Sequence, residues 1–372
     1  MPLMRTNSWA LAPEVSLLST SPIYEISCSV PVRACVLWKS ALCLLVSLAV
    51  IPPAFPHSQE PAPPAGEPIR VSVDRVNVGV IVTDPRGNFA EGLHREDFHV
   101  FDDGVEQPVT DFAAIEEPAQ VLLLVEAGPA VYFLEASHLQ AAHALLEGLS
   151  AGDQVAVVKY DDAAQPLLNF TANKQAAEAA LAKVRFNLGF GNLNLSRSLT
   201  AVLDWLAKGQ GKKTIVLLST GVDTSPDNDA IAILERLKTS DVRLLAVSLS
   251  SELRNPPPTG KPGGKNKAKA PTEKSIAAEK GFAEADQLLK IMTETTGGRA
   301  YFPNSTKDFS TAFAEIAQLV RHEYSVAFAP PAHDGKLHAI EVRISQPPTA
   351  TPNTPPPVYR VDYRRAYRAP AP

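Results

Sequence analysis

The sequence contains little cysteine, and none of it lies in the part that could form a core. The chain of 372 residues has three cysteines, Cys28, Cys35 and Cys43. A form processed after Cys43 would have no thiol, which excludes disulfides and cysteine chemistry from it. An excess of positive charge is also missing, because the formal net charge is −5. This balance gives no electrostatic case for binding nucleic acid, so no nucleic-acid partner is expected.

The local signatures of common active sites are absent as well. The stretch GFGNLN has two glycines but is neither a GxGxxG motif nor a P-loop. Ser219 lacks the G-x-S-x-G context of a nucleophilic serine. Three histidines towards the end of the chain, His322, His333 and His338, accompany β sequence and are interpreted as surface residues. We therefore expect that the protein is not an enzyme, with a hydrolase hidden in an α/β fold as an alternative.

Long hydrophobic runs are limited to one stretch of eleven residues, 41–51. It follows the basic residues Arg33 and Lys39, and Ser-Leu-Ala at 47–49 offers a cleavage site, which predicts a secretory signal peptide. A membrane-spanning helix needs about 20 residues, so this run is short for a membrane span. We therefore expect an exported protein that is periplasmic, in the cell envelope or extracellular, with a membrane tether through 41–51, if it is uncleaved, as the alternative.

Composition divides the chain into successive segments. These are an N-terminal extension with the signal peptide (1–51), a Pro-rich tether (52–68), an N-terminal β region (69–116), an α/β domain (117–321) and a C-terminal β region (322–368). Asp103-Gly104 lies between two alternating runs and predicts a β-hairpin. Because strand-rich ends bracket the α/β domain, we expect a β-sandwich into which this domain is inserted. Two independent β units are the alternative.

Apolar runs alternate with helical periods in the α/β domain. The expected strands are 121–126, 154–160, 214–220, 242–250 and 299–303. The expected helices are roughly 133–149, 173–184, 194–208, 228–239, 283–296 and 306–321. Continuous apolar strands between helices predict a mostly parallel sheet with helices on both faces. Asn173 and either Asp227 or Asn228 are expected to cap helices, and Gly297-Gly298 to end one.

Residues 252–281 interrupt this pattern with a stretch rich in Pro, Gly and Lys. Its position after an expected strand and before an expected helix indicates an exposed, flexible insertion. The alternative is that its basic residues contact an acidic partner or an anionic envelope surface.

Several phrases, among them VLLLVEAGPAV and KKTIVLLSTGVDTSP, resemble those of a von Willebrand factor type A (vWA) domain. More narrowly, the chain is similar to the secreted bacterial VWFA-related family over roughly residues 69–369, which HDGKLHAIEVRI fits too. The resemblance implies a doubly wound, Rossmann-like sheet with strand order 3-2-1-4-5-6. It also implies a binding site at the carboxyl edge of the strands, beside the first strand.

The family usually carries a metal-ion-dependent adhesion site at that edge, with Asp-x-Ser-x-Ser, a Thr and a second Asp. Mg²⁺ needs six oxygen ligands, which carboxylates, hydroxyls and waters supply. This sequence departs at every matched position, which are Glu126, Gly128, Ala130, Leu193 and Thr220. The resemblance therefore implies an adhesion site that has degenerated.

Neighbouring polar residues do not restore the expected ligand set. Asn192, Asn194 and Asp223 could supply oxygens, but not at the family's positions. A site with one carboxylate and mostly neutral ligands should bind Mg²⁺ poorly. We therefore expect neither a metal nor another cofactor, with Mg²⁺ or Mn²⁺ bound by substituted ligands as the alternative.

The sequence thus favours an exported, non-enzymatic module that binds another protein without a metal ion. The expected binding rim consists of Glu126, Ala127, Gly128, Pro129, Ala130, Asn192, Leu193, Asn194, Thr220 and Asp223. With Leu193 and Ala130 in place of hydroxyl residues, a more apolar contact is expected there. A metal-dependent adhesion module and a purely structural envelope protein are the alternative functions.

Overall fold

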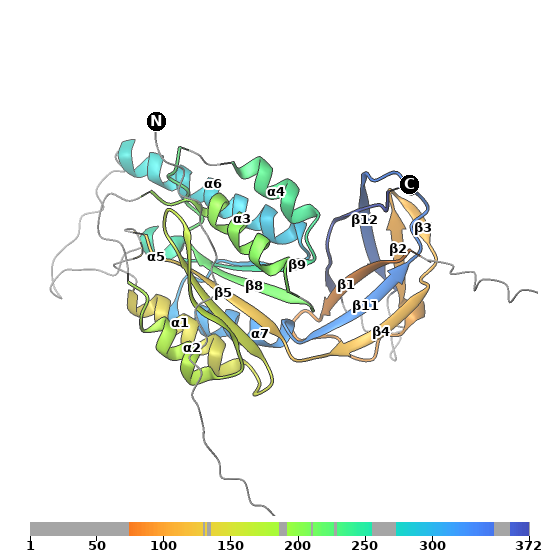
Figure 1. The fold of residues 1–372 in the computed structure, drawn as a ribbon, viewed down its shortest axis with the longest axis horizontal. Helices are drawn as coiled ribbons and strands as arrows, with labels where there is room; N and C mark the ends of the chain where they lie inside the picture. Colours follow the sequence, from red (N-terminus) through yellow and green to blue (C-terminus); the bar gives the residue numbers. More distant parts are fainter. Residues whose placement is uncertain are drawn as a thin grey trace, which may run out of the picture. The chain divides into compact units, whose positions relative to one another are not determined.

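The computed structural model describes the following residues: 74–128, 131, 135–185, 192–209, 211–226, 229–254, 273–345 and 358–371. All of them belong to one compact unit, Arg70–Pro372. The predicted signal peptide, the Pro-rich tether, Pro129 and Ala130 lie outside the described residues. Figure 1 shows the arrangement of the elements.

A six-stranded sheet forms the centre of the α/β domain. Its strands are β5 (Gln120–Glu126), β6 (Gln154–Tyr160), β7 (Ala164–Thr171), β8 (Lys213–Ser219), β9 (Val242–Ser248) and β10 (Ala300–Tyr301). Their spatial order is β10-β9-β8-β5-β6-β7. Neighbours are parallel except β6 and β7. Counted along the chain, this order reads 3-2-1-4-5-6, as the resemblance implies, and the predicted mostly parallel sheet is confirmed.

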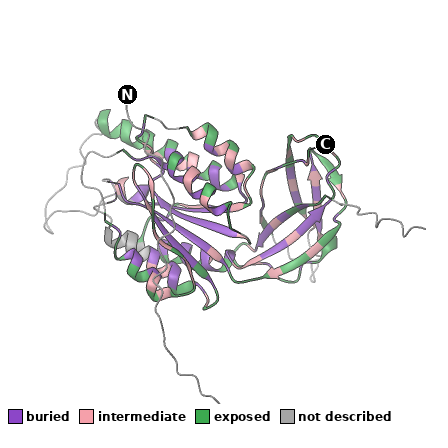
Figure 2. Cartoon of the chain, viewed as in Figure 1, coloured by how far each residue is buried: buried purple, intermediate pink, exposed green. Residues whose placement is uncertain are grey.

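Helices cover both faces of this sheet (Figure 1). On one face lie α1 (Glu135–Gly148), α2 (Lys174–Leu181) and α7 (Thr306–Leu319); on the other lie α3 (Leu195–Leu206), α4 (Ala230–Lys238) and α6 (Glu273–Thr295). A short helix, α5 (Ser250–Arg254), follows β9. Alternate residues of a strand point to opposite faces, so Leu123 packs in one core and Leu122 in the other. Figure 2 shows how completely the central strands are buried.

One strand of the sheet is missing from the sequence prediction. β7 is antiparallel to β6, with register shifts along the pair, and it occupies the edge of the sheet. Its residues are exposed or half-buried and include Pro166. An edge strand can accept a proline because one of its sides needs no ladder hydrogen bonds. The strand therefore lacks the apolar run by which the other strands are recognised.

The helices begin and end close to their expected positions, with two differences. The side chain of Asn173 accepts a hydrogen bond from Ala176 N, and Gly297 ends α6 with a φ of 71°, as predicted. α4 is capped by Asp229 instead of a neighbouring residue, since its side chain accepts from Ala232 N. α6 already begins at Glu273, inside the predicted insertion, where Ala, Glu and Lys favour helix. In the described part of the chain, no helix has both the length and the apolar character needed to cross a membrane.

The segments on either side of the α/β domain form two four-stranded sheets. One has the order β13 (Arg360–Asp362), β1 (Val76–Thr83), β11 (His322–Phe328) and β4 (Asp111–Glu116). The other has the order β14 (Ala366–Arg368), β12 (Leu337–Ile344), β2 (Phe98–Asp102) and β3 (Val105–Gln107), with a 3₁₀ turn at Arg95–Asp97 before β2. Each sheet pairs strands from both ends of the chain, and one apolar cluster joins the two sheets. These strands therefore do not form two independent β units.

The predicted hairpin between β2 and β3 is confirmed. Asp102 pairs with Val105, which leaves a two-residue turn of Asp103 and Gly104. Both turn residues have positive φ, 47° and 83°. This is the conformation that an Asp-Gly turn adopts most readily, because its twist matches that of the strands.

Candidate functional site at the carboxyl edge of the sheet

The candidate site lies where the strand order reverses, at the carboxyl ends of β5 and β8. In open α/β sheets this switch point is the usual place for a ligand. β5 is paired with β6 on one side and β8 on the other. Glu126 ends β5, and Thr220 directly follows β8. The sequence-predicted residues Glu126 and Thr220 are thus brought together at this edge.

The Glu126 carboxylate is fully buried, with 0% of the residue exposed. Its Oε2 accepts hydrogen bonds from Thr220 N at 2.7 Å, Ser219 Oγ at 2.8 Å and the Tyr160 hydroxyl at 3.1 Å. Thr220 Oγ1 lies 3.0 Å from both carboxylate oxygens and donates to them. The donors come from β6, from β8 and from the loop after it. The carboxylate therefore joins three segments of the sheet edge through protein donors alone.

The buried surroundings of Glu126 disfavour the charged form of its carboxyl group. Burial raises the pKa of the Glu126 carboxyl above its ordinary value, and the hydrogen bonds from Thr220, Ser219 and Tyr160 lower it only in part. Burial and the neighbouring Glu126 likewise raise the pKa of Tyr160. Ser219 Oγ also accepts Gly221 N–H at 2.8 Å, which holds the hydroxyl in place. The sequence analysis did not include Ser219 and Tyr160 among the expected site residues, although both lie at or next to the end of a predicted strand.

A contact between Gly128 and Leu193 fills the space next to Glu126. A Cβ atom added to Gly128 would lie 2.7 Å from Leu193 Cδ2, closer than carbon atoms can approach. Leu193 is only 3% exposed and belongs to the core under α3. The leucine therefore occupies the volume that a serine at position 128 would need. Two of the substituted positions consequently depend on each other sterically.

Asn194 and Asp223 are already engaged in holding the surrounding loops. Asn194 caps α3 by accepting from Arg197 N at 2.8 Å, and its amide donates to Ser225 Oγ. Asp223 Oδ2 accepts from Leu195 N at 3.1 Å, at the helix N-terminus where a carboxylate is favoured. Its Oδ1 accepts from Ser225 N. Both oxygens of Asp223 thus accept hydrogen bonds from the surrounding backbone, which leaves this carboxylate poorly suited to be a metal ligand.

The match to a known family agrees with this geometry. The family model for the von Willebrand factor type A domain matches residues 136–314. The chain carries a von Willebrand factor type A domain. Among curated proteins, none matches the sequence significantly.

Several solved structures are similar to the chain at low sequence identity. A von Willebrand factor type A protein from Catenulispora acidiphila is 9% identical, with 80% of this chain and 75% of that chain covered at a TM-score of 0.40. An aerotolerance-related membrane protein from Bacteroides fragilis is 13% identical, with coverages of 54% and 99% and a TM-score of 0.37. The PilB minor pilin from Streptococcus sanguinis is 11% identical, with coverages of 55% and 62% and a TM-score of 0.38.

The expected rim of the vWA domain is largely buried. Of its ten residues, Glu126, Ala127, Gly128, Leu193, Asn194 and Thr220 are buried, Asp223 is half-buried, Asn192 is exposed, and Pro129 and Ala130 lie outside the described residues. Leu193 therefore cannot supply the apolar contact that the sequence suggested, because its side chain packs inward against Gly128. The exposed surface here is polar, and includes Asn192, Thr224 and Asp162.

A hollow lined by residues of both the vWA domain and the flanking β strands offers a weaker candidate. It measures about 460 Å³, and its lining includes the basic residues Lys212, Arg243 and Arg364. Glu323 pairs with Arg243 at 3.1 Å and also with Lys212, and Asp241 pairs with Arg364 at 2.9 Å. Burial, and then the nearby Arg243, lower the pKa of Lys212 to about 8. Because carboxylates already pair with these cations, the contacts do not indicate that the hollow binds an anionic ligand.

The raised pKa of Glu126 predicts a pH-dependent loss of stability that Glu126→Gln removes. Between the unfolded and folded pKa values the native state keeps a proton that the unfolded state has released, so wild-type stability falls as pH rises above about 4.3. In Glu126→Gln, the free energy of unfolding, measured in urea from pH 4 to 8, should not show this fall with rising pH. The exposed Glu147→Gln is the control and should follow the wild type; equal slopes in all three proteins would contradict the prediction.

The steric link between positions 128 and 193 predicts non-additive mutations. Gly128→Ser alone should lower the free energy of unfolding by about 1–3 kcal/mol, because its Cβ meets the leucine. Combined with Leu193→Thr, it should cost less than the sum of the single changes, with a coupling of about 1 kcal/mol or more. The control partner is Leu203→Thr, a buried leucine further along α3. Additive costs in both cycles would refute the link.

Proposed function

We propose that the chain is an exported, non-enzymatic module that binds another protein through its vWA domain without a metal ion or other cofactor. A vWA domain supports a role in protein interaction or adhesion in general. The more specific proposal rests on the contacts at the carboxyl edge of the sheet. In this proposal the partner contacts the exposed loops, and not the buried position at which the family usually holds a metal ion.

The hydrogen bonding of Glu126 is the observation that carries this proposal. Its carboxylate receives Thr220 N–H and the hydroxyls of Ser219, Thr220 and Tyr160. A metal ion bound there would have to displace these donors, and each displaced donor would need a new partner in a buried place. Leu193 closes the same space from the side of Gly128. Metal-dependent adhesion with substituted ligands is therefore the less favoured function.

The exposed part of the edge is built to be rigid. Leu193 N donates to Thr224 Oγ1 at 2.8 Å, and Thr224 N donates back to the Leu193 carbonyl at 3.0 Å. Asn194 N donates to the Asp161 carbonyl at 2.9 Å, which joins these loops to the end of β6. Loops fixed in this way lose little conformational entropy on binding. Asn192, exposed between them, is well placed to contact a partner through hydrogen bonds.

The two four-stranded sheets are proposed to form one β-sandwich that supports the inserted vWA domain. Arg243 of β9 donates to Glu323 of β11 at 3.1 Å and to the Gly79 carbonyl of β1 at 3.1 Å. Arg299 pairs with Asp362 of β13. Burial alone would raise the pKa of Glu323, but Arg243 and Lys212 outweigh it and the net pKa is lowered. These buried ion pairs join the sandwich to the vWA domain.

Limited proteolysis tests the shared sandwich. After cleavage near residues 117 and 321, the fragments that carry β1–β4 and β11–β14 should co-purify by size exclusion, because their strands pair and share one core. A stable fragment of roughly 118–321 that is released without such a pair would contradict the sandwich. Cleavage within 255–272, between α5 and α6, is the internal control, since it leaves the β strands uncut.

A pull-down from the native cell envelope tests the binding surface. Asn192→Arg should abolish capture of the partner, because a long cation there blocks close contact with the edge. The control is Ala207→Arg, which places the same residue at the opposite end of α3. EDTA should leave capture by the wild type unchanged. Capture that is lost in EDTA and restored by Mg²⁺ or Mn²⁺, or that is equally reduced by both variants, would overturn the proposal.

The same preparation tests export, which rests on residues 33–51 of the sequence. Mass spectrometry of the exported protein should find an N-terminus after the cleavage site at 47–49. A peptide from residues 1–30 in that protein would contradict cleavage. Retention of 41–51 would instead favour the membrane tether, and capture of no partner at all would favour a purely structural envelope protein.

A further inference from the structure

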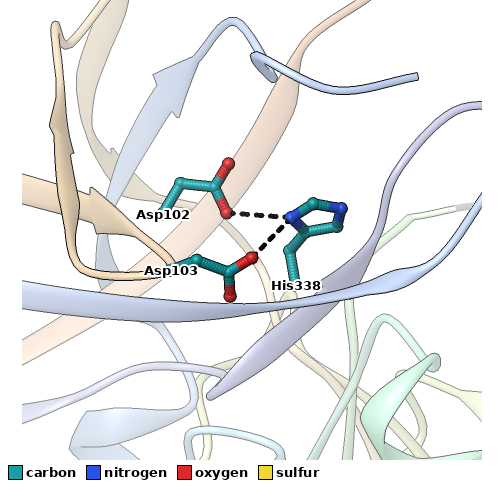
Figure 3. A group of neighbouring side chains, drawn as sticks. All are labelled: Asp102, Asp103 and His338. Carbon is teal, nitrogen blue, oxygen red and sulfur yellow. Dashed lines mark ion pairs between the residues drawn. The ribbon is translucent and has the colours of Figure 1, made fainter. Parts of the chain in front are cut away.

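A cluster of two carboxylates and one imidazole lies in the β region, away from the vWA edge. Asp102 ends β2, Asp103 begins the following turn, and His338 lies in β12, which pairs with β2. Figure 3 shows that the three side chains converge, with both carboxylates directed at one ring nitrogen of His338. The backbone fixes this approach, since Asp103 N donates to the Ala339 carbonyl at 2.9 Å and Ala339 N donates to Asp103 Oδ1 at 2.8 Å.

The potential ligand atoms are spaced as ligands of one ion would be. His338 Nδ1 lies 2.9 Å from Asp103 Oδ2 and 3.6 Å from Asp102 Oδ1. One ligand atom from each residue fits within a span of 4.8 Å. Ligands about 2.0–2.1 Å from a zinc ion, at a tetrahedral angle, are separated by about 3.4 Å. The cluster therefore needs only small movements to surround a metal ion.

Two buried atoms of this cluster lack a hydrogen-bond partner among the described residues. They are Asp102 Oδ1 and His338 Nδ1. The Asp102 side chain is only 2% exposed. Its other oxygen accepts from the Tyr367 hydroxyl at 3.1 Å. A buried carboxylate oxygen without a donor is costly, and a cation between these two atoms would satisfy both at once.

The second nitrogen of the imidazole is oriented by another carboxylate. His338 Nε2 lies 3.1 Å from Asp334 Oδ1, which also accepts Lys336 N–H at 2.9 Å. A carboxylate on the far nitrogen is the usual support of a metal-binding histidine, because it fixes the ring and strengthens the ligand. The His338 side chain is 12% exposed, and the residue is therefore half-buried at the surface.

We propose that Asp102, Asp103 and His338 bind a divalent transition-metal ion, with Zn²⁺ as the best match. One nitrogen and two carboxylate oxygens suit Zn²⁺, whereas Mg²⁺ prefers oxygen ligands alone and keeps several waters. The Asp103 side chain is 57% exposed, which gives the ion a path of entry and leaves a position for water. The ion would link the β2–β3 turn to β12, and hence the segments before and after the vWA domain.

Calorimetry on the full chain, freed of metal with EDTA and dialysed, tests this site. Zn²⁺ should bind with one ion per chain and raise the melting temperature, and Mg²⁺ should do neither. His338→Gln should weaken Zn²⁺ binding more than about 100-fold, because it removes a ligand. Asp334→Asn, which removes only the orienting carboxylate, should weaken it by about 10-fold to 100-fold.

A matched control separates the site from ordinary surface histidines. His99 contacts Glu106 at 2.7 Å in the same sheet, but that pair is exposed. His99→Gln should leave Zn²⁺ affinity unchanged. Glu126→Gln should leave it unchanged too, so the result does not depend on the function proposed for the vWA edge. If His338→Gln fails to fold by circular dichroism, the exposed Asp103→Asn decides, since Asn tolerates the same turn conformation.

Two outcomes would overturn the proposal. The first is that the wild type binds no Zn²⁺, which would leave the cluster as an imidazolium between carboxylates. The second is that the folded ligand variants bind Zn²⁺ as tightly as the wild type does. Loss of affinity in both ligand variants, with His99→Gln unaffected, would establish the site.

Discussion

A carboxylate that is withdrawn completely from water needs donors on every side, and Glu126 obtains them from the sheet edge itself. Tyr160 ends β6, Ser219 ends β8, and Thr220 begins the loop after β8. The hydrogen bonds from these residues fix the ends of three adjacent strands relative to one another. Removing the Thr220 hydroxyl, the donor to Oε1, would leave that buried oxygen under-satisfied at a cost of about 1–3 kcal/mol. The geometry of the edge thus depends on keeping the acid and its donors together.

This arrangement explains why the other substitutions at the edge form a set. Where a metal site presents small hydroxyl residues to an ion, this chain has Gly128 and Leu193 in mutual contact, and the leucine belongs to the core. Asp223 and Asn194 hold the loops by capping α3 and contacting Ser225. The loops are therefore ordered by the protein's own hydrogen bonds. A preorganised surface of this kind supports the proposal of metal-independent binding.

The sequence predicted most strands and helices because their patterns come from burial, which the sheet imposes uniformly. It failed at β7, where an edge position removes the need for an apolar run and accepts Pro166. It placed Glu126 and Thr220 at the ends of strands that prove to be neighbours, but it did not predict that they are buried. Glycine at 128 looks like an open turn, and only the tertiary contact with Leu193 shows that the space is filled. Tyr160 and Ser219 likewise looked like ordinary strand residues, since nothing local reveals that they meet Glu126.

Glu126 and Asp102, two buried carboxylates, differ in one physical property, the supply of hydrogen-bond donors. Glu126 has donors for both of its oxygens, so an added cation would have to replace bonds that already exist. Asp102 is also buried, although less completely, and has one donor, Tyr367, while its Oδ1 faces His338 Nδ1 without a directional hydrogen bond. A cation there would replace only the ion pair between His338 Nδ1 and Asp103 Oδ2, and it would satisfy Asp102 Oδ1 and His338 Nδ1 together. The difference in donor supply is therefore why we propose a metal ion at the Asp102 cluster and none at Glu126.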